Sequence, residues 1–352
     1  MKVVFVLLSL ILFSFPARQQ AQSEKPRKGK RTLVSVPVAV SDREGRYISG
    51  LKEDDFMILQ DGEKQKISFF ATEEEPVSVA LLLDTSGSTK DVLGEIREAA
   101  EDFIELMNPG DRTMIAAFDS KIRILQPFTS DKKALKNSLG GIRTDTEQGS
   151  VLLRAVEQLA RGAFTDAREK ERRKVIVLLS DGKDLGSPLQ KSELLAQLEE
   201  SDVLIYSIFY QTGKGFEKIV VEKDGVVREG KESKKPKKAK KRKKTKGYTV
   251  TIPISGDTFT PEEIKLTDKA ASIEGVNFLQ EMSDTTAGRF YQSDAPNFSR
   301  VFKQIAGELR RQYRLGFYTT DATGATVRNI SVRVLRPDVV VRARGRFRAK
   351  QL

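Results

Sequence analysis

The sequence contains no cysteine, no histidine and no tryptophan among its 352 residues. Zinc sites built from Cys or His, triads with a His base, Cys nucleophiles, haem ligation by His or Cys and disulfide frameworks are therefore excluded. The chemistry that remains is that of oxygen ligands together with Lys and Arg. With 39% hydrophobic residues, the chain can bury a full core and has room for one large or two modest domains.

The first 23 residues have the composition of a secretory signal peptide. Lys2 precedes an apolar stretch from Val3 to Phe15, and small and polar residues follow up to the cleavage triplet Ala21-Gln22-Ser23. The apolar stretch is shorter than the ~20 residues that a membrane-spanning helix needs. We therefore expect cleavage, a mature chain without a transmembrane span, and a periplasmic, cell-surface or secreted location. The alternative is an uncleaved single anchor.

The formal net charge of +12 is concentrated in one segment. Residues 231–246 contain eleven basic residues and a single acid, so they account for nearly all of the excess positive charge. The rest of the chain is close to neutral, and the high isoelectric point says little about its folded surface.

Both flanks of the chain predict β structure. After a polar linker at residues 24–31, residues 32–73 contain short alternating strands separated by turns. Pro37 has no N–H donor, which predicts that the first strand lies at a sheet edge. Residues 319–352 contain two further alternating strands. We expect the two flanks to pack together as one small β unit.

Between residues 74 and 318, strands alternate with helices. This pattern predicts an α/β domain with a doubly wound, mostly parallel sheet and helices on both faces. Gly149-Ser150 is expected to cap a helix over 151–159, and Ser187-Pro188 to begin a helix over 189–200. Residues 211–270, which include the Lys-rich tract, interrupt the alternation as an insertion, and the next helix is expected at 276–286.

Two apolar strands of this domain, 77–84 and 174–179, end in polar side chains. In an open parallel sheet, ligands bind outside the carboxyl ends of the strands. The N-terminus of a helix that starts at residue 150 should lie at the same edge of the sheet. The candidate ligands, all with oxygen donors, are Asp84, Ser86, Ser88, Ser150 and Asp181. Such a shell suits Mg²⁺ or Ca²⁺, with Mn²⁺ close behind, and leaves water-filled positions that an Asp or Glu of a protein partner can take.

Three segments together resemble the metal-ion-dependent adhesion site of von Willebrand factor type A domains: Asp84-Thr85-Ser86-Gly87-Ser88, Gly149-Ser150 and Leu178-Leu179-Ser180-Asp181-Gly182. The resemblance covers about residues 74–318. Residues 50–56, 60–62 and 312–317 resemble a bacterial exported subfamily of these proteins. The resemblance implies a protein-interaction or adhesion module that is not an enzyme, with Mg²⁺ (or Ca²⁺ or Mn²⁺) as cofactor.

The resemblance also implies a role for each ligand. Ser86 and Ser88 coordinate the cation directly, while Asp84 and Asp181 act largely through water. Position 150 departs from the pattern, because the family usually has a Thr ligand there. A serine lacks the methyl group that restricts the rotamer, which predicts weaker metal affinity. Thr144 and Thr146, in the same loop, are alternative donors.

Two other interpretations of these residues stay open. The hydroxyls are also those expected of a capping cluster that satisfies loop backbone groups without a metal. An enzyme would need Ser86 or Ser180 to act with Lys183, but no spacing indicates a nucleophile with a positioned base.

The Lys-rich tract at 231–246 supports an alternative function, although a solvated loop is its simplest interpretation. The tract is expected to attract polyanions or an envelope surface, and the metal site would then be vestigial. It has no sequence specificity for nucleic acid, because no aromatic residue is interleaved with the basic ones. The basic residues concerned are Lys237, Lys238, Lys240, Lys241, Arg242, Lys243 and Lys244.

Overall fold

A computed structural model describes residues 31–72, 75–144, 149–170, 172–211, 219–221, 227–229, 261–320 and 327–348. The expected signal peptide, nearly all of the expected linker and the Lys-rich tract lie outside these residues. Nothing in the described part of the chain therefore tests those three predictions.

The described strands are β1 (Arg31–Asp42), β2 (Phe56–Gln60), β3 (Glu63–Gln65), β4 (Phe69–Ala71), β5 (Val77–Asp84), β6 (Arg112–Phe118), β7 (Ile122–Thr129), β8 (Arg173–Ser180), β9 (Val203–Tyr210), β10 (Ile219–Val221), β11 (Val227–Glu229), β12 (Phe290–Ser293), β13 (Tyr313–Thr320), β14 (Val327–Val334), β15 (Val339–Ala343) and β16 (Arg346–Arg348). The described α-helices are α1 (Leu93–Leu106), α2 (Lys132–Leu139), α3 (Leu152–Gln158), α4 (Ala167–Lys170), α5 (Lys191–Glu200), α6 (Pro261–Thr285) and α7 (Phe298–Leu309). Short 3₁₀ turns cover Glu53–Asp55, Gly87–Val92 and Ala295–Asn297, and a π-turn covers Leu159–Ala163.

The central sheet in the described part of the chain has six strands in the order β12-β9-β8-β5-β6-β7. Its strands run parallel except β7, which pairs antiparallel with β6 at the edge. All eight residues of β5 are buried, as expected of a central strand with helices on both faces. The chain leaves β5 toward β6 and later enters β8 on the opposite side. The carboxyl end of β5 is therefore a topological switch point, where ligands bind in such sheets.

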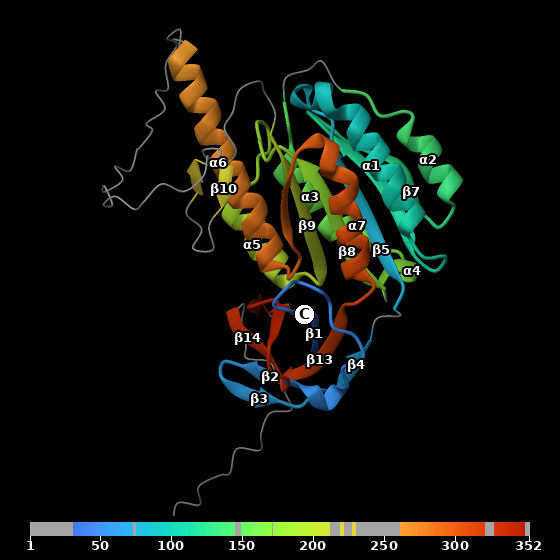
Figure 1. The fold of residues 1–352 in the computed structure, drawn as a ribbon, viewed down its shortest axis with the longest axis vertical. Helices are drawn as coiled ribbons and strands as arrows, with labels where there is room; N and C mark the ends of the chain where they lie inside the picture. Colours follow the sequence, from blue (N-terminus) through green and yellow to red (C-terminus); the bar gives the residue numbers. More distant parts are fainter. Residues whose placement is uncertain are drawn as a thin grey trace, which may run out of the picture.

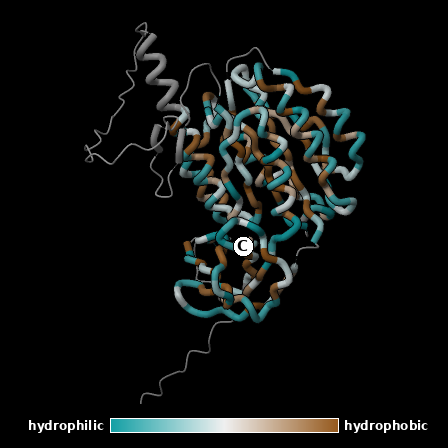
Figure 2. Tube along the Cα trace, in the orientation of Figure 1, coloured by the Kyte–Doolittle hydropathy of each residue, from teal (hydrophilic) through white to brown (hydrophobic). Residues whose placement is uncertain are grey.

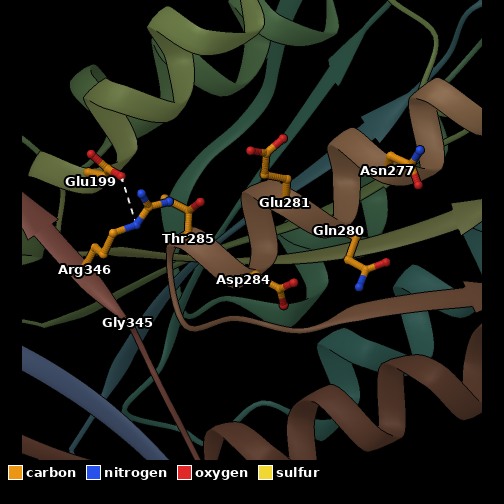
Figure 3. A pocket seen from close by; sticks show the side chains of 8 residues that line it. All are labelled: Glu199, Asn277, Gln280, Glu281, Asp284, Thr285, Gly345 and Arg346. Atoms are coloured by element: carbon orange, nitrogen blue, oxygen red, sulfur yellow. Dashed lines mark ion pairs between the residues drawn. The ribbon is translucent and has the colours of Figure 1, made fainter. Parts of the chain in front are cut away.

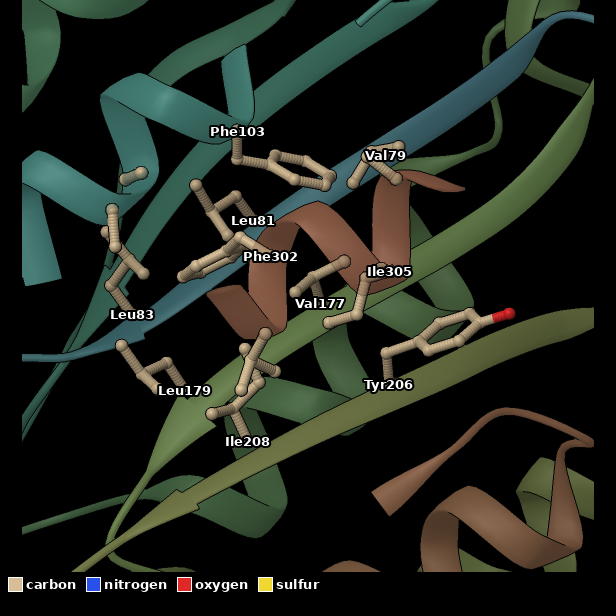
Figure 4. Packing of buried hydrophobic residues seen from close by; sticks show 14 of the residues in the cluster. Val79, Leu81, Leu83, Phe103, Val177, Leu179, Tyr206, Ile208, Phe302 and Ile305 are labelled. Carbon is tan, nitrogen blue, oxygen red and sulfur yellow. The ribbon is translucent and has the colours of Figure 1, made fainter. Parts of the chain in front are cut away.

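Helices cover both faces of the sheet, which confirms the predicted fold class (Figure 1). On one face, α1, α2 and α7 pack against the odd-numbered residues of β5, as Figure 4 shows for Leu81 beside Phe103 and Phe302. The rings of Phe103 and Phe302 lie 5.3 Å apart. On the other face, α3, α5 and α6 pack against even-numbered residues such as Leu82. The hydrophobic segments gather inside these layers (Figure 2).

The flanks form a second, all-β unit below the α/β domain in Figure 1. Its two four-stranded sheets have the orders β15-β1-β13-β4 and β16-β14-β2-β3. They enclose a core that includes Val36, Ile58, Tyr313 and Phe317. Residues from both ends of the chain thus share one core, as the sequence predicts. The strand at 313–320 pairs with β1 and β4, so it belongs to this unit, although the predicted α/β range extended to residue 318.

A buried charge joins the two units. The Glu308 side chain, near the end of α7, is fully buried and accepts a hydrogen bond of 2.7 Å from the Tyr206 hydroxyl of β9. It also forms an ion pair with Arg342 of β15. Arg344, buried as well, donates a 2.7 Å hydrogen bond to the backbone carbonyl of Glu199 in α5. These partners compensate part of the desolvation of the buried charged groups, and the contacts of Arg342 and Arg344 connect the β unit to the domain.

Two predictions about the elements were wrong. β1 is an inner strand, because it pairs with β13 over Arg31–Val38 and with β15 over Val38–Asp42. Pro37 is tolerated because it lies just before the pairing with β15 begins, where the strand still has one neighbour. α6 begins at Pro261 rather than at 276, so the last ten residues assigned to the insertion are helical.

Candidate functional site

The carboxylate of Asp84 lies at the end of β5, fully buried, with hydrogen bonds to both of its oxygens. Its Oδ1 accepts hydrogen bonds from the Ser86 hydroxyl at 2.6 Å and from the Ser86 backbone N–H at 3.0 Å. Its Oδ2 accepts a hydrogen bond of 2.7 Å from the hydroxyl of Ser180, which ends the neighbouring strand β8. The two strand ends that the sequence singles out are therefore in direct contact.

The hydroxyls of Ser86 and Ser88 lie 3.1 Å apart in the turn that follows β5. Ser86 is 7% exposed, whereas Ser88 is exposed to solvent. Because the Ser86 hydroxyl donates its hydrogen bond to Asp84, the lone pairs of the Ser86 oxygen remain available as acceptors. The turn thus offers two hydroxyl oxygens side by side, one of them facing solvent.

Asp181 follows β8 and is almost fully buried. Its carboxylate accepts a 3.2 Å hydrogen bond from the Lys183 backbone N–H and lies 3.5 Å from the Lys183 ammonium group. The loop turns at Gly182, whose φ of +77° is in the left-handed region, and a Cβ there would lie 2.8 Å from backbone atoms of Gly275 in α6. Only glycine fits both the backbone angle and the close approach, so α6 fixes the position of this loop.

Ser150 lies in a segment that backbone hydrogen bonds tie to two other loops of the same rim. Its carbonyl accepts a 2.8 Å hydrogen bond from the N–H of Leu185 in the loop after β8. The N–H of Val151, the next residue, donates to the carbonyl of Asp119 after β6. The Ser150 side chain is 2% exposed, and its hydroxyl has no hydrogen-bond partner within the described residues.

Ser150 does not cap α3, contrary to the prediction. The N-cap residue is Val151, and the free N–H groups of the first turn are satisfied by the loop after β8. Leu153 donates to the Asp184 carboxylate at 3.0 Å, and Arg154 donates to the Ser187 hydroxyl at 3.1 Å. The cap comes from a distant part of the chain, which leaves the Ser150 hydroxyl unused by the helix.

Ser187 is therefore engaged with α3 rather than with α5. Its hydroxyl donates a 2.6 Å hydrogen bond to Asp184. α5 begins at Lys191, after Gln190, and has no side-chain cap. The prediction that Ser187 caps this helix was wrong, because the Ser187 hydroxyl bonds to Asp184 and to the N–H of Arg154 in α3 instead.

Asp119 is a second buried carboxylate near this rim. It accepts hydrogen bonds from the Thr85 hydroxyl and the Lys121 backbone N–H, both at 3.0 Å, and forms an ion pair with Arg123. Burial alone would raise the pKa of Asp119, but the hydrogen bonds from Arg123, Lys121 and Thr85 outweigh it and lower the pKa. Asp119 is not among the predicted site residues, because nothing in the local sequence pattern indicates its contacts with Thr85 and Arg123.

Asp84 is electrostatically different from Asp119. Burial raises the pKa of Asp84 to about 7, and the charge of Asp181 adds to the rise, while hydrogen bonds from Ser86 and Ser180 oppose it. The same two carboxylates contribute to raising the pKa of Tyr210, after the larger effect of burial. Two acids of like charge in a low-dielectric environment favour either a proton or a cation between them.

These residues fit a hard cation by their donor chemistry. The chain has no His or Cys, and no three acidic side chains gather as a metal-binding group within the described residues. The carboxylates of Asp84 and Asp181, the paired hydroxyls of Ser86 and Ser88 and the unsatisfied hydroxyl of Ser150 are all oxygen donors, as Mg²⁺ or Ca²⁺ requires. The hydroxyls of Ser86 and Ser180 both donate to Asp84, and the Lys183 ammonium group faces Asp181.

Of the alternative donors and the basic residues of the tract, only Thr144 lies within the described part of the chain. Thr144 lines a hollow of about 300 Å³ beside Arg123 and Arg143. Thr146 and the seven basic residues of the Lys-rich tract lie outside the described residues. Asp184 and Ser187, which brace the loop after β8, were not predicted as part of the site. Their Asp-x-x-Ser spacing is the one local signal of a capping turn.

A larger pocket of about 360 Å³ lies away from this rim, near the junction with the β unit (Figure 3). Glu281 and Asp284 of α6 line it, and Glu199 of α5 forms an ion pair with Arg346 across it. Burial raises the pKa of Asp284. An acidic hollow whose one cation is already paired indicates no ligand by itself.

Comparison with known proteins identifies one segment of the chain. Residues 79–183 match the family model of the von Willebrand factor type A domain. No curated protein matches the chain. None of the described helices is both long and apolar enough to cross a membrane.

Several solved structures are similar to the chain. An aerotolerance-related membrane protein from Bacteroides fragilis NCTC 9343 is 18% identical, with 66% of this chain and 98% of that chain covered and a TM-score of 0.42. Proximal thread matrix protein 1 from the mussel byssus, with a zinc-occupied MIDAS motif, is 13% identical (72% and 50% covered, TM-score 0.46). The vWF domain of the type V pili tip protein Mfa5 from Porphyromonas gingivalis is 12% identical (66% and 94% covered, TM-score 0.40). At TM-scores below 0.5 these likenesses carry no argument about function.

Proposed function

We propose that the chain is a protein-interaction and adhesion module that binds an acidic group of a protein partner through a divalent cation. The proposal is supported by the match of residues 79–183 to the family model of the von Willebrand factor type A domain. Domains of this family are generally interaction modules, and they commonly bind a divalent cation at a metal-ion-dependent adhesion site. The proposed cation is Mg²⁺, with Ca²⁺ or Mn²⁺ as substitutes. The proposed ligands are Asp84, Ser86, Ser88, Ser150 and Asp181.

The observation that carries this proposal is the buried hydroxyl of Ser150, which has no hydrogen-bond partner within the described residues. A buried polar group left unsatisfied costs about 1–3 kcal/mol, and such groups in native proteins need an explanation. The helix that Ser150 precedes takes its cap from Asp184 and Ser187 instead. A capping cluster without a metal therefore does not account for this hydroxyl, whereas an oxygen-liganded cation does.

The chain's own residues prepare the site in two ways. Ser86 and Ser180 donate hydrogen bonds to Asp84 and so hold its carboxylate in one orientation. Lys183 lies beside Asp181 and offsets part of the negative charge. When bound, the cation supplies a positive centre that an incoming carboxylate can reach in place of water. The exposed side of Ser88 leaves the approach open to solvent.

The proposed location is outside the cytoplasm, in the periplasm, at the cell surface or in the medium. This part of the proposal rests on the composition of residues 1–23, which lie outside the described residues. The proposed partner is a protein of the same compartment that exposes an Asp or Glu.

Titration calorimetry with Mg²⁺ and Mn²⁺ tests the metal site. We expect saturable heat from the unmodified chain and at least a tenfold loss of affinity for Ser150→Ala. The matched control is Ser138→Ala, a half-buried serine of α2 whose hydroxyl donates to the Leu135 carbonyl, and it should bind the cation normally. Absence of heat from the unmodified chain would contradict the proposal.

The alternative function assigns the affinity to the Lys-rich tract, which has eleven basic residues within 231–246. Binding through such a tract should weaken steeply between low and physiological salt, whereas binding through the cation should respond to a chelator. Deleting 231–246 should abolish retention on heparin while leaving the heat of Mg²⁺ binding unchanged. If binding of acidic peptides were insensitive to the chelator and were lost on deletion of 231–246, the alternative would be favoured.

A further inference from the structure

One large apolar side chain is exposed in the loops that surround the candidate metal site. Leu185, in the loop between β8 and α5, is 72% exposed, the largest value among the exposed large hydrophobic residues described. It lies four positions after Asp181 in the sequence. The remaining large exposed hydrophobic residues lie on β7 or in the β unit: Leu33, Ile124, Tyr318, Leu335 and Val340.

The loop that presents Leu185 is braced at several points. The Leu185 N–H donates a 2.8 Å hydrogen bond to the Ser150 carbonyl. On either side of it, Asp184 accepts the N–H of Leu153, and Ser187 accepts the N–H of Arg154. The backbone on which Leu185 is displayed is therefore fixed before any partner arrives. A partner that packs on it avoids the entropic cost of ordering a flexible loop.

The surroundings of Leu185 are polar. The exposed residues of the turn after β5 are Gly87, Ser88, Lys90 and Asp91. Lys183 is 24% exposed on the same loop as Leu185. A cation accepts any accessible carboxylate, so it cannot by itself distinguish one acidic partner from another. An apolar contact beside it supplies that distinction, because interfaces gain most of their energy from a few buried side chains surrounded by polar ones.

We propose that Leu185 is the specificity contact of this site, and that the partner presents an Asp or Glu with a large apolar side chain within a few residues of it. The acid faces the cation and the apolar side chain packs on Leu185. This inference rests on the proposed function, because it assumes that an acidic group of the partner binds at the same rim.

The test uses a displayed library of linear peptides that contain one fixed Asp between randomised positions. The full-length chain selects peptides in Mg²⁺, and a parallel selection contains a chelator. The variants are Leu185→Ser and, as the matched control, Leu335→Ser, which replaces a 63% exposed leucine of the β unit. Both sites are exposed, and circular dichroism checks that both variants fold.

We expect Leu, Ile, Phe or Met to be enriched near the fixed Asp with the unmodified chain and with Leu335→Ser, but not with Leu185→Ser. For one enriched peptide, Leu185→Ser should weaken binding by about tenfold, the effect of losing the burial of a few methylene groups. The same peptide with Ser in place of its apolar residue should bind both chains within about twofold.

The outcomes separate this inference from the proposed function. Mg²⁺-dependent retention of Asp peptides without apolar enrichment, or with enrichment that survives Leu185→Ser, would overturn the role of Leu185 alone. If no Asp peptide were retained in Mg²⁺ above the chelator background, both the proposed function and the inference would be wrong.

Discussion

Replacing Asp84 by Asn should stabilise the metal-free protein at alkaline pH. Asp84 is fully buried, and burial together with the charge of Asp181 raises its pKa from 3.8 to about 7. Between pH 4 and 7 the folded state therefore binds more protons than the unfolded state. The free energy of unfolding then falls as the pH rises through this range and stays at its lower value above pH 7.

The size of the effect follows from the shift. A difference of about three pKa units corresponds to at most about 4 kcal/mol, and relaxation around the charge reduces it. Asn cannot ionise, and its side chain can still accept from Ser86 and donate to the Ser180 hydroxyl. We expect Asp84→Asn to be more stable than the unmodified chain by about 1–4 kcal/mol at pH 8. At pH 5, little more than one unit above the unfolded pKa, the difference should be less than half of its pH 8 value, at most about 1.7 kcal/mol.

Urea unfolding followed by far-UV circular dichroism, with a chelator present, measures these values at both pH values. The matched control is Asp119→Asn, since Asp119 is equally buried but its pKa is lowered and it pairs with Arg123. This control should lose about 1–2 kcal/mol at pH 8, because the partly exposed Arg123 loses its partner. Added Mg²⁺ should raise the stability of the unmodified chain and leave Asp84→Asn unchanged.

The reasoning would be refuted if Asp84→Asn lost as much stability as Asp119→Asn at pH 8. It would also be refuted if the difference between Asp84→Asn and the unmodified chain were the same at pH 5 and pH 8. Either result would mean that the Asp84 carboxylate is not penalised for its charge in the metal-free fold.

Two further variants test how the site and the junction are built. Gly182→Ala should lower the unfolding midpoint and weaken the heat of Mg²⁺ binding, because its Cβ would meet the Gly275 backbone at 2.8 Å. The control is Gly62→Ala, at φ +89° with nothing within 4 Å. It should cost only the ~1 kcal/mol of the left-handed backbone and should bind Mg²⁺ normally. Glu308→Ala should cost about 3–5 kcal/mol in urea unfolding, because it leaves buried partners unpaired. The control Glu105→Ala replaces an exposed residue paired with lysines and should leave the midpoint nearly unchanged. Equal midpoints for the two variants would show that Glu308 does not hold the units together.

Much of the fold was predictable from local pattern. The apolar runs at 77–84 and 203–210 are strands of the central sheet because a fully buried parallel strand has no polar face to show. The contact between the ends of β5 and β8 was equally predictable from the sequence. Both strands end in an acid or hydroxyl, and parallel strands end at the same edge of the sheet. The cap of α2 is equally local, since the Asp131 carboxylate accepts hydrogen bonds from the N–H groups two and three positions away.

The structural features that the local sequence pattern did not predict depend on contacts with residues far along the chain. Ser150 is in an ideal capping position, yet Asp184, from another loop, reaches the helix instead. Pro37 predicts an edge strand, yet β15 pairs with β1 from Val38, the next residue. Strand β13 follows α7 as if it continued the alternation of helices and strands in the α/β domain. Only its pairing with β1 places it in the β unit.

The sequence by itself determined which chemistry is open to this protein, because the absence of His and Cys leaves oxygen donors, and the strand ends show where these gather. The tertiary structure alone decided how those donors behave. The raised pKa of Asp84, the unsatisfied hydroxyl of Ser150 and the exposure of Leu185 each depend on the groups packed around them. Desolvation and long-range hydrogen bonding are properties of the packed chain, and no local run of residues encodes them.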